Sequence, residues 1–364
     1  MTDFINRFLG FTIQIQQIPA PTFEESRRAE FVRAKFIEEG LADISRDEMN
    51  NVYARLAGKG RAAPLIVSAH MDTVFPAATN LEVRKEADKI FGPGIGDNSL
   101  GVAALFGLLW KLRERKAELD GDVWLVANTG EEGLGDLRGM RAVVDRFGNQ
   151  VKAYLIVEGM ALGHVYHRAI GVRRYHITVR TAGGHSWSDY GQPSAVHELA
   201  RLMTQITALH LPSTPRTTLN VGVIGGGTTV NTLAAEAWMD LDLRSEDSNT
   251  LAILTEQIEK LIASANRDGI SVESKVTSQR PSGEITPSHP LIHLAMDCVR
   301  EQGLDINLTS GSTDANIPLS RGIPALVLGV TLGGGAHTTH EFIDTRYVSQ
   351  GMEQLVNFVS KVWK

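Results

Sequence analysis

Two patterns of hydrophobic and polar positions divide the chain. In the first half, short continuous apolar runs, typical of strands buried on both faces, alternate with longer segments whose apolar residues recur at helical spacing. They predict strands at 51–56, 65–69, 123–129 and 154–157, and helices at 3–19, 24–39 and 100–112. Thr22 and Glu25 predict a capping box at the start of the second helix. This alternation favours an α/β fold with a mixed, mostly parallel sheet flanked by helices.

From about residue 171 the pattern becomes strict alternation of polar and apolar residues, which is typical of half-exposed antiparallel strands. This region predicts strands at 173–180, 217–224, 234–244 and 270–278, and helices at 194–209 and 247–266. The α/β pattern then returns, with a helix at 290–302 and a strand at 325–330. We therefore predict a discontinuous α/β domain, residues 1–171 and 286–364, into which an α+β domain, residues 172–285, is inserted.

Histidine and acidic residues stand at the ends of the predicted strands of the first half or just before its third helix. They are His70, Asp97, Glu131, Glu132 and Glu158. Each acid taken alone is more often a solvated charge in a loop than a ligand. Because the carboxyl ends of parallel strands meet at one edge of a sheet, their joint occurrence there indicates a shared site.

With a later histidine, this set has the composition of a metal site. Its candidate ligands are His70, Asp97, Glu132, Glu158 and His337. Imidazole and carboxylate ligands suit zinc, manganese or cobalt. Five ligands are too many for one tetrahedral catalytic zinc that keeps a water, but they suit two ions about 3.5–4 Å apart that share a carboxylate. Glu131 would then be free to act as a general base, and Asp72 could fix the orientation of the His70 ring.

Composition narrows the class of protein. The 364 residues include 36 basic and 42 acidic side chains, a net charge of −6, which does not indicate a nucleic-acid or membrane partner. Cys298 is the only cysteine, so an internal disulfide and a cysteine-based zinc cluster are excluded. The first residues lack the features of a secretory signal, and no apolar run approaches the ~18 residues of a membrane span. We expect a soluble cytoplasmic protein.

Motifs of other enzyme classes fail at defined positions. The stretch 184–188 departs from the Gly-x-Ser-x-Gly pattern of serine hydrolases at its last position. Residues 222–227 have the glycine spacing of a phosphate loop, but Thr-Thr follows them instead of Lys-Ser/Thr. A dinucleotide-binding pattern at 92–97 lacks its third glycine, because residue 97 is aspartate.

Five motifs together resemble one enzyme family. They are His70-Met-Asp72, Gly94-Ile-Gly-Asp97-Asn98, Gly130-Glu131-Glu132-Gly133, Glu158-Gly159 and Gly335-Ala-His337-Thr-Thr-His-Glu341. In this order they resemble the co-catalytic di-zinc exopeptidases and deacylases, which include aminoacylase, glutamate carboxypeptidase, peptidase T and the succinyl-diaminopimelate desuccinylases. The resemblance extends over essentially the whole chain.

The resemblance implies a role for each candidate. His70, Asp97 and Glu158 would hold one metal ion, and Asp97, Glu132 and His337 the other, with Asp97 as the bridge and Glu131 as the base. The ions would be zinc, with cobalt or manganese as alternatives. The family pattern places the ligand at His337 and ranks His340 second. It also implies a cis peptide bond between Asp97 and Asn98.

The inserted domain resembles the lid and dimerisation domain of the family. The resemblance implies that His185, in Gly183-Gly-His185-Ser, reaches across a homodimer to polarise the scissile carbonyl in the partner subunit. Asn231 and Arg244 match positions that bind substrate oxygens or a terminal carboxylate, and Gly311 and Ser312 lie where the family lines the substrate pocket. Alternatively, Arg244 only pairs with a surface acid.

These features predict a two-metal hydrolase that cleaves a peptide or N-acyl amide bond beside a free carboxylate, in a small peptide or an N-acyl amino acid. Glu158 favours the carboxypeptidase and deacylase branch, because the tripeptidases usually have aspartate there. The Ser312-Thr313-Asp314 region instead favours relatives of peptidase T, so a peptidase-T-like aminotripeptidase or dipeptidase is the first alternative. The second is a catalytically silent metal-binding dimer.

Overall fold

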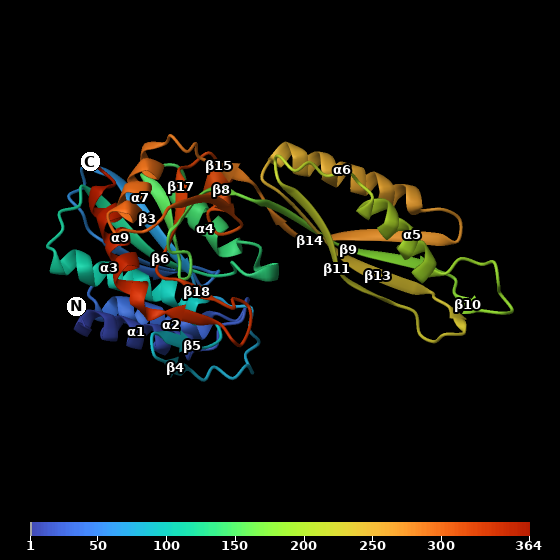
Figure 1. The fold of residues 1–364 in the computed structure, drawn as a ribbon, viewed down its shortest axis with the longest axis horizontal. Coiled ribbons are helices and arrows are strands. Elements are labelled where there is room, and N and C mark those ends of the chain that lie inside the picture. Colours follow the sequence, from blue (N-terminus) through green and yellow to red (C-terminus); the bar gives the residue numbers. More distant parts are fainter. Residues whose placement is uncertain (1) are drawn as a thin grey trace. The chain divides into compact units, whose positions relative to one another are not determined.

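The computed structural model describes residues 2–364 and divides the chain into two compact units (Figure 1). Unit 1 comprises the chain up to Ala169 together with Glu284–Lys364, and unit 2 comprises Ile170–Gly283. Unit 1 is an α/β domain built on a mixed sheet, as the apolar runs predicted. The roles expected for the two units, catalytic domain and lid, stay predictions.

The large sheet of unit 1 has the strand order β1-β2-β6-β3-β7-β17-β8-β15, and β16 pairs with β8. Its strands are β1 (Ala42–Arg46), β2 (Val52–Leu56), β3 (Ala62–His70), β6 (Gly121–Asn128), β7 (Ala153–Glu158), β8 (His164–Ala169), β15 (Gly283–Glu284), β16 (Asn307–Gly311) and β17 (Ala325–Gly329). The central strands β6, β3, β7 and β17 run parallel, whereas β1 pairs antiparallel with β2 and β2 with β6. Strand β8 pairs antiparallel with β17 and parallel with β16. The central parallel strands therefore end at one edge of the sheet.

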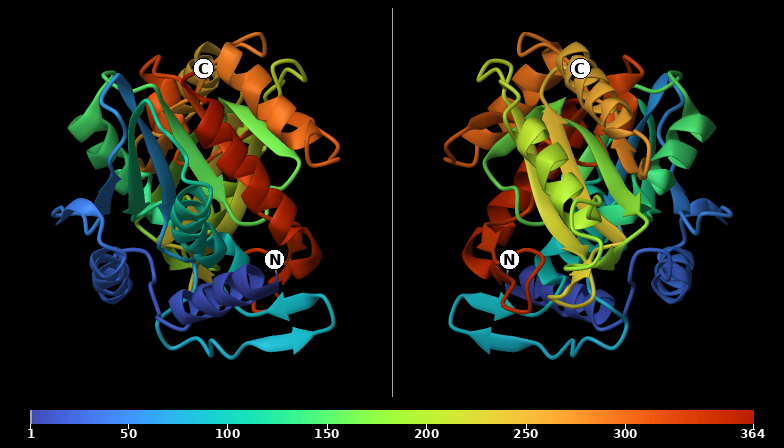
Figure 2. Two further views of the ribbon diagram at one scale, coloured as in Figure 1. Left: turned by 90° about the vertical axis from the view of Figure 1, so that its left-hand side faces the viewer. Right: turned by 90° about the vertical axis from the view of Figure 1, so that its right-hand side faces the viewer.

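Helices cover both faces of this sheet. Leu65, Val67 and Ala69 of β3 face a core with α1 (Thr2–Gln16), α2 (Ser26–Glu38), α3 (Gly101–Glu114), α7 (Pro290–Arg300) and α9 (Val348–Lys361). The alternate residue Ile66 faces a second core with α4 (Arg138–Phe147) and α8 (Asn316–Ser320). Helices α3 and α9 lie side by side (Figure 1 and Figure 2). Burial on both faces explains why these strands read as continuous apolar runs.

A second, small sheet in unit 1 brings two loops together, the loop before β19 (Phe342–Asp344) and the segment after β5 (Lys89–Phe91). Its order is β18-β19-β5-β4, with β18 (Gly333–Gly334) and β4 (Arg84–Glu86) at the edges. Antiparallel pairing of Phe342 with Phe91 places the loop before β19 beside the segment that follows β5. That segment leads into the irregular turn η1 (Ile95–Leu100).

Unit 2 is an antiparallel sheet with two helices. The strand order is β11-β13-β9-β14, from β9 (Gly171–Thr181), β11 (Thr217–Gly226), β13 (Glu236–Ser245) and β14 (Ile270–Arg280). Alternate residues of β9 and β13 pack with α5 (Ala195–Thr207) and α6 (Ser248–Ala265) in one core. A short pair, β10 (Gly184–His185) and β12 (Thr232–Leu233), joins two loops of this unit.

Several local predictions were wrong. The capping box does not form, because Thr22 Oγ1 donates to Asp72 Oδ2 at 2.9 Å and Glu25 Oε1 accepts from the Phe23 N–H at 2.9 Å. The first helix ends at Gln16 rather than at residue 19. Helices α4, α8 and α9 and strands β1, β8 and β16 were not predicted. No helix among residues 2–364 is long and apolar enough to cross a bilayer.

Candidate metal centre

The strand ends bring the predicted ligands together at one edge of the large sheet. His70 is the last residue of β3 and Glu158 the last residue of β7, a neighbouring parallel strand. His70 is in register with Asn128, the last residue of β6, so Glu131 and Glu132 follow directly at the same edge. Asp97 comes from η1 and His337 from the loop between β18 and β19.

Asp97 lies between two histidines and offers each a different oxygen. Its Oδ1 is 3.2 Å from His70 Nε2, and its Oδ2 is 3.2 Å from His337 Nε2. His70 Nε2 is also 3.7 Å from Glu158 Oε2, and His337 Nε2 is 3.2 Å from Glu132 Oε1. Two triads result, His70 with Asp97 and Glu158, and His337 with Asp97 and Glu132, each with its ligand atoms within 4.8 Å of one another.

These separations fit tetrahedral metal ions. Zinc–nitrogen and zinc–oxygen bonds of about 2.0–2.2 Å place two ligands of one tetrahedron about 3.3–3.6 Å apart. Three of the four measured separations equal 3.2 Å and the fourth is 3.7 Å. The donor set, imidazole and carboxylate with one carboxylate common to both triads, is the type that holds two divalent ions. The residues therefore fit the metals implied by the sequence.

Asp72 lies against the His70 ring and also supports the loop of the two glutamates. The Nδ1 atom of His70 contacts the main-chain carbonyl of Asp72 at 3.1 Å, whereas the Asp72 carboxylate oxygen is 3.6 Å away. That contact directs His70 Nε2 toward Asp97 and Glu158. The buried Asp72 carboxylate also accepts the N–H groups of Glu131 at 3.0 Å and Glu132 at 2.9 Å. Asp72 therefore holds the loop that carries both glutamates.

The concentration of carboxylates changes the protonation of the ligands. Burial is the largest influence on Glu132 and Glu158 and raises the pKa of each to about 7. Burial opposes protonation of His70, but the nearby carboxylates of Asp72, Asp97 and Glu158 outweigh it and raise its pKa. Hydrogen bonds with Asp97 and Glu132 raise the pKa of His337 to about 10. In the metal-free protein, bound protons offset the repulsion between these carboxylates. A divalent cation that displaces the protons would neutralise the same negative charge.

Three buried residues that the sequence reasoning did not assign hold this edge in place. Asn98 donates to the Val157 carbonyl at 2.9 Å and accepts from the Gly101 and Gly159 N–H groups, which ties η1 to the end of β7. The predicted cis peptide bond joins Asp97 to Asn98. The others are Glu341 and Asp314. Asn98 and Glu341 stand within the quoted motifs and Asp314 stands in the Ser312-Thr313-Asp314 region, so the sequence marked all three positions without assigning them a role.

A search with family models matches residues 66–361 to "Peptidase family M20/M25/M40". This match covers most of the chain and includes every ligand of both triads. The chain belongs to this family. It is therefore a metal-dependent enzyme of the metallopeptidase and amidohydrolase type.

Similar proteins can be aligned with this chain over nearly its whole length. The succinyl-diaminopimelate desuccinylase of Corynebacterium glutamicum is 24% identical over 369 residues, which cover 99% of this chain and 98% of the relative. The fold is similar to that of a tripeptidase from Staphylococcus aureus, with a TM-score of 0.86, 23% identity and 98% of both chains covered. It is also similar to aminopeptidase PepT from Bacillus cereus, with a TM-score of 0.83, 21% identity and 99% of both chains covered.

In unit 2 of the M20 peptidase, the His185 loop is exposed and internally braced. His185 Nδ1 accepts hydrogen bonds from the N–H groups of Trp187 at 3.2 Å and Ser188 at 3.4 Å, and the His185 N–H donates to Asp189 at 2.7 Å. A ring that accepts at Nδ1 carries its proton on Nε2 when neutral. Nε2–H is therefore available as a hydrogen-bond donor.

The other candidate substrate-binding residues differ in whether their side chains are exposed or already paired within the protein. Asn231 is exposed, and its carbonyl accepts from the Ser186 N–H at 3.0 Å, which joins it to the His185 loop. Arg244 Nε donates to Asp242 at 2.7 Å, so this arginine is paired within its own strand, as the alternative to a substrate role predicted. His340 belongs to neither triad.

Gly311 ends β16, and Ser312 follows it in unit 1. The loop continues to Asp314, which is fully buried and accepts from Asn128 Nδ2 at 2.7 Å. Because Asn128 ends β6 directly before the glutamate loop, this bond places the Ser312 loop next to the metal edge. Burial, reinforced by the negative charge of Glu131, raises the pKa of Asp314 well above its ordinary range.

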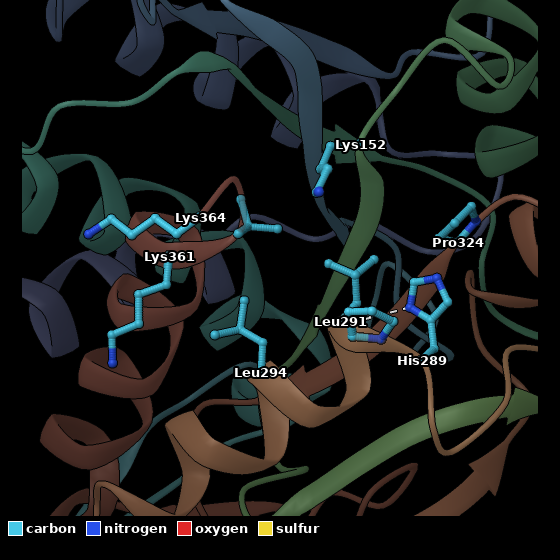
Figure 3. A pocket seen from close by; sticks show the side chains of 9 residues that line it. Lys152, His289, Leu291, Leu294, Pro324, Lys361 and Lys364 are labelled. Atoms are coloured by element: carbon cyan, nitrogen blue, oxygen red, sulfur yellow. Dashed lines mark hydrogen bonds between the residues drawn. The ribbon is translucent and has the colours of Figure 1, made fainter.

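A separate pocket lies at the opposite end of β7 (Figure 3). Its cavity of about 630 Å³ is lined by Lys152, His289, Pro290, Leu291, Leu294, Pro324, Lys361, Val362 and Lys364. Lys152 precedes β7 and Glu158 ends it, so about 20 Å of strand separates this pocket from the triads. Its lysines do not converge: Lys361 pairs with Glu301 at 2.6 Å, and in Figure 3 the Lys361 and Lys364 side chains point away from His289.

Proposed function

We propose that the protein is a two-metal hydrolase that cleaves a peptide or N-acyl amide bond next to a free carboxylate, in the manner of a carboxypeptidase or deacylase. One observation carries this proposal: Asp97 presents its two carboxylate oxygens to two different histidines, each at 3.2 Å. A carboxylate that offers one oxygen to each of two sets of ligands is the arrangement that bridges two ions in a two-metal site. The full-length similarity to a desuccinylase supports the acyl-amide branch.

The chain's own residues divide the work. His70, Asp97 and Glu158 would hold one divalent ion, and Asp97, Glu132 and His337 the other. Zinc suits these ligands best, with cobalt or manganese as alternatives. When bound, such ions supply Lewis acidity that polarises the scissile carbonyl and acidifies water. Glu131, held by Asp72 through its N–H group, would accept a proton from the attacking water and deliver it to the leaving amine.

We assign substrate recognition to residues of both units. Gly311 and Ser312 lie on a loop that adjoins the metal edge through Asp314 and Asn128. His185 of a partner subunit would donate its Nε2–H to the oxyanion, because Nδ1 already accepts two N–H groups. Asn231 would contact substrate oxygens, and Arg244 would bind a carboxylate after leaving Asp242.

We further propose a homodimer formed through unit 2. β11 is an edge strand of its sheet, and Val223 and Ile224 are 49% and 54% exposed on it. Such an edge suits pairing with a second copy. Sedimentation at micromolar concentration should therefore give twice the mass of one chain; the mass of one chain would exclude the shared site. The cytoplasmic location also stays a prediction.

The rate ratio for two substrates tests the type of activity. Metal-reconstituted protein is given a short peptide with a free N-terminus and, separately, the same peptide acetylated. We expect the acetylated peptide to be cleaved at least as fast, because the proposed site recognises a carboxylate and an acyl amide. Cleavage of the free peptide alone would establish the aminopeptidase alternative, which the Ser312-Thr313-Asp314 region favours. If neither is cleaved while metal is bound, substrates with other acyl groups are tested next, and only their failure would favour the metal-binding dimer.

A further inference from the structure

Glu341 is a buried carboxylate that contacts the loop of one metal ligand from the loop of another. Its side chain is inaccessible to solvent and accepts three main-chain N–H groups. Gly94 donates to Oε2 at 3.1 Å, and Gly96 and Asp97 donate to Oε1 at 2.7 and 2.8 Å. All three donors belong to the segment that delivers Asp97 to the site.

The main chain of Glu341 makes the same connection. It stands immediately before β19, whose Phe342 pairs with Phe91 of β5. The Glu341 carbonyl accepts from the Gly92 N–H at 2.9 Å, which extends this pairing by one residue. The Glu341 N–H in turn donates to the Thr338 carbonyl at 3.2 Å, within the turn that carries His337. Four hydrogen bonds thus join Glu341 to residues 92–97.

We infer that Glu341 is a positioning residue that sets the separation between Asp97 and His337, the two ligands that would face the same ion. This inference rests on the proposed metal site. Glu341 belongs to neither triad, and its carboxylate is occupied by N–H donors, so it acts through the loops. The separation that it sets, 3.2 Å between Asp97 Oδ2 and His337 Nε2, matches two ligands of one tetrahedral ion.

The chemistry of this position calls for a carboxylate. Three N–H donors converge on two oxygens, and both oxygens of a carboxyl group can accept. Glutamine has nearly the same shape but replaces one oxygen with an NH₂ group, which would face an N–H donor. Glycines at positions 92, 94 and 96 give the backbone of this segment more conformational freedom than other residues would, and Gly94 has a φ of +68°. Without the carboxylate, the position of Asp97 relative to His337 is therefore less well defined.

The two candidate ion sites should respond differently to its loss. The triad of His70, Asp97 and Glu158 retains support from strands β3 and β7 and from the hydrogen bonds of Asn98. The triad of Asp97, Glu132 and His337 depends on the loop before β19, to which Glu341 belongs. The effect should therefore concentrate on the second ion.

Calorimetric titration of metal-free protein with zinc, against a competing chelator, tests this inference. The wild-type chain should bind two ions, and E341Q should bind one of them about 10–100-fold more weakly, the range seen when groups that orient metal ligands are removed. The control E118Q makes the same chemical change at an exposed glutamate paired with Lys59 and should bind both ions normally. Equal affinities for both ions in folded E341Q and the wild type would overturn the inference.

A second comparison tests whether Glu341 acts on the same ion as His337. H337A removes a ligand of the affected ion, and the double variant H337A/E341Q should bind no more weakly than H337A at that site, because the two changes act on one ion. If E341Q does not fold, E341D replaces it: the charge stays, but the carboxylate withdraws by one methylene. Unchanged affinities in E341D would then overturn the inference. Failure of the wild type to bind any ion would instead refute the proposed function.

Discussion

At the scale of single residues, the site works because individual carboxylates contact two partners at once. Asp97 faces both His70 and His337, and Asp72 holds the N–H groups of both Glu131 and Glu132. Adjacent glutamates on one braced loop can point differently. Glu132 lies 3.2 Å from His337, whereas Glu131 belongs to neither of the two triads that share Asp97, although it lies close to His70 and Glu132. In the proposed mechanism, this difference would let Glu132 bind metal while Glu131 moves a proton.

Replacement of Glu131 by glutamine tests that role. Glutamine keeps the shape and the main-chain bond to Asp72 but cannot accept a proton. We expect E131Q to retain both ions and its kcat to fall by a factor of roughly 10²–10⁴, the usual contribution of general acid–base catalysis. Metal content by mass spectrometry and steady-state kinetics of the same preparation give both quantities. A kcat within a factor of two of the wild type would remove Glu131 from the mechanism.

The candidate metal ligands that the fold brings together could be predicted from the sequence, whereas most of the contacts that hold their loops could not. His70 and Glu158 end apolar strands, so the local pattern was enough to bring them to one edge. Glu341, by contrast, bonds to partners 244 to 247 positions away, and Asp314 bonds to Asn128 186 positions away. Such contacts depend on the complete fold. The same reason explains Thr22, whose hydroxyl bonds to Asp72 rather than capping its own helix.

At the scale of secondary structure, the buried parallel strands were the most predictable elements. β3, β6 and β7 are continuous apolar runs because helices cover both their faces. Strands β8 and β16, which are partly exposed and polar, lack that signal. Helix α9 also escaped prediction, although it supplies buried residues to the main core. Its place in the fold depends on close contact with the end of the sheet.

Gly351 makes that contact possible. A Cβ atom added there would lie 1.7 Å from the Val330 carbonyl oxygen, directly after β17. We expect G351A to lose about 3 kcal/mol of unfolding free energy, because α9 must move away from the sheet. G10A, in α1, is the matched control: no atom lies within 4 Å of the added Cβ, so stability should rise by about 0.5–1 kcal/mol. Urea unfolding of both metal-free proteins measures the difference, and similar midpoints would contradict this account.

At the scale of the whole molecule, folding concentrates negative charge that the unfolded chain disperses. Four carboxylates, those of Asp97, Glu131, Glu132 and Glu158, adjoin two histidines at one edge of unit 1. The sequence showed the number of these charges but not the degree of their burial, which raises the pKa of Glu132 and Glu158 to about 7. The unfavourable free energy of burying these carboxylates together arises only in the complete fold, and bound cations would offset it.

The dependence of stability on pH follows from those shifts. Glu132 and Glu158 rise from an ordinary pKa of 4.5 to about 7, and His337 rises from 6.5 to about 10. A group with a raised folded pKa contributes stability that is complete below its unfolded pKa and is lost as pH rises through the folded value. The metal-free protein should therefore become less stable between pH 5 and pH 8.

Metal should reverse this trend, because ions bind the deprotonated ligands and their affinity increases with pH. The difference in Tm between zinc-loaded and chelator-treated protein should therefore be larger at pH 8 than at pH 6. Scanning calorimetry at both pH values measures it, and H185A, changed in an exposed loop of unit 2, should show the same widening. H337A, which lacks one raised group and one ligand, should show a smaller widening. An equal gap at both pH values in the wild type would mean that these ligands are not protonated in the metal-free site.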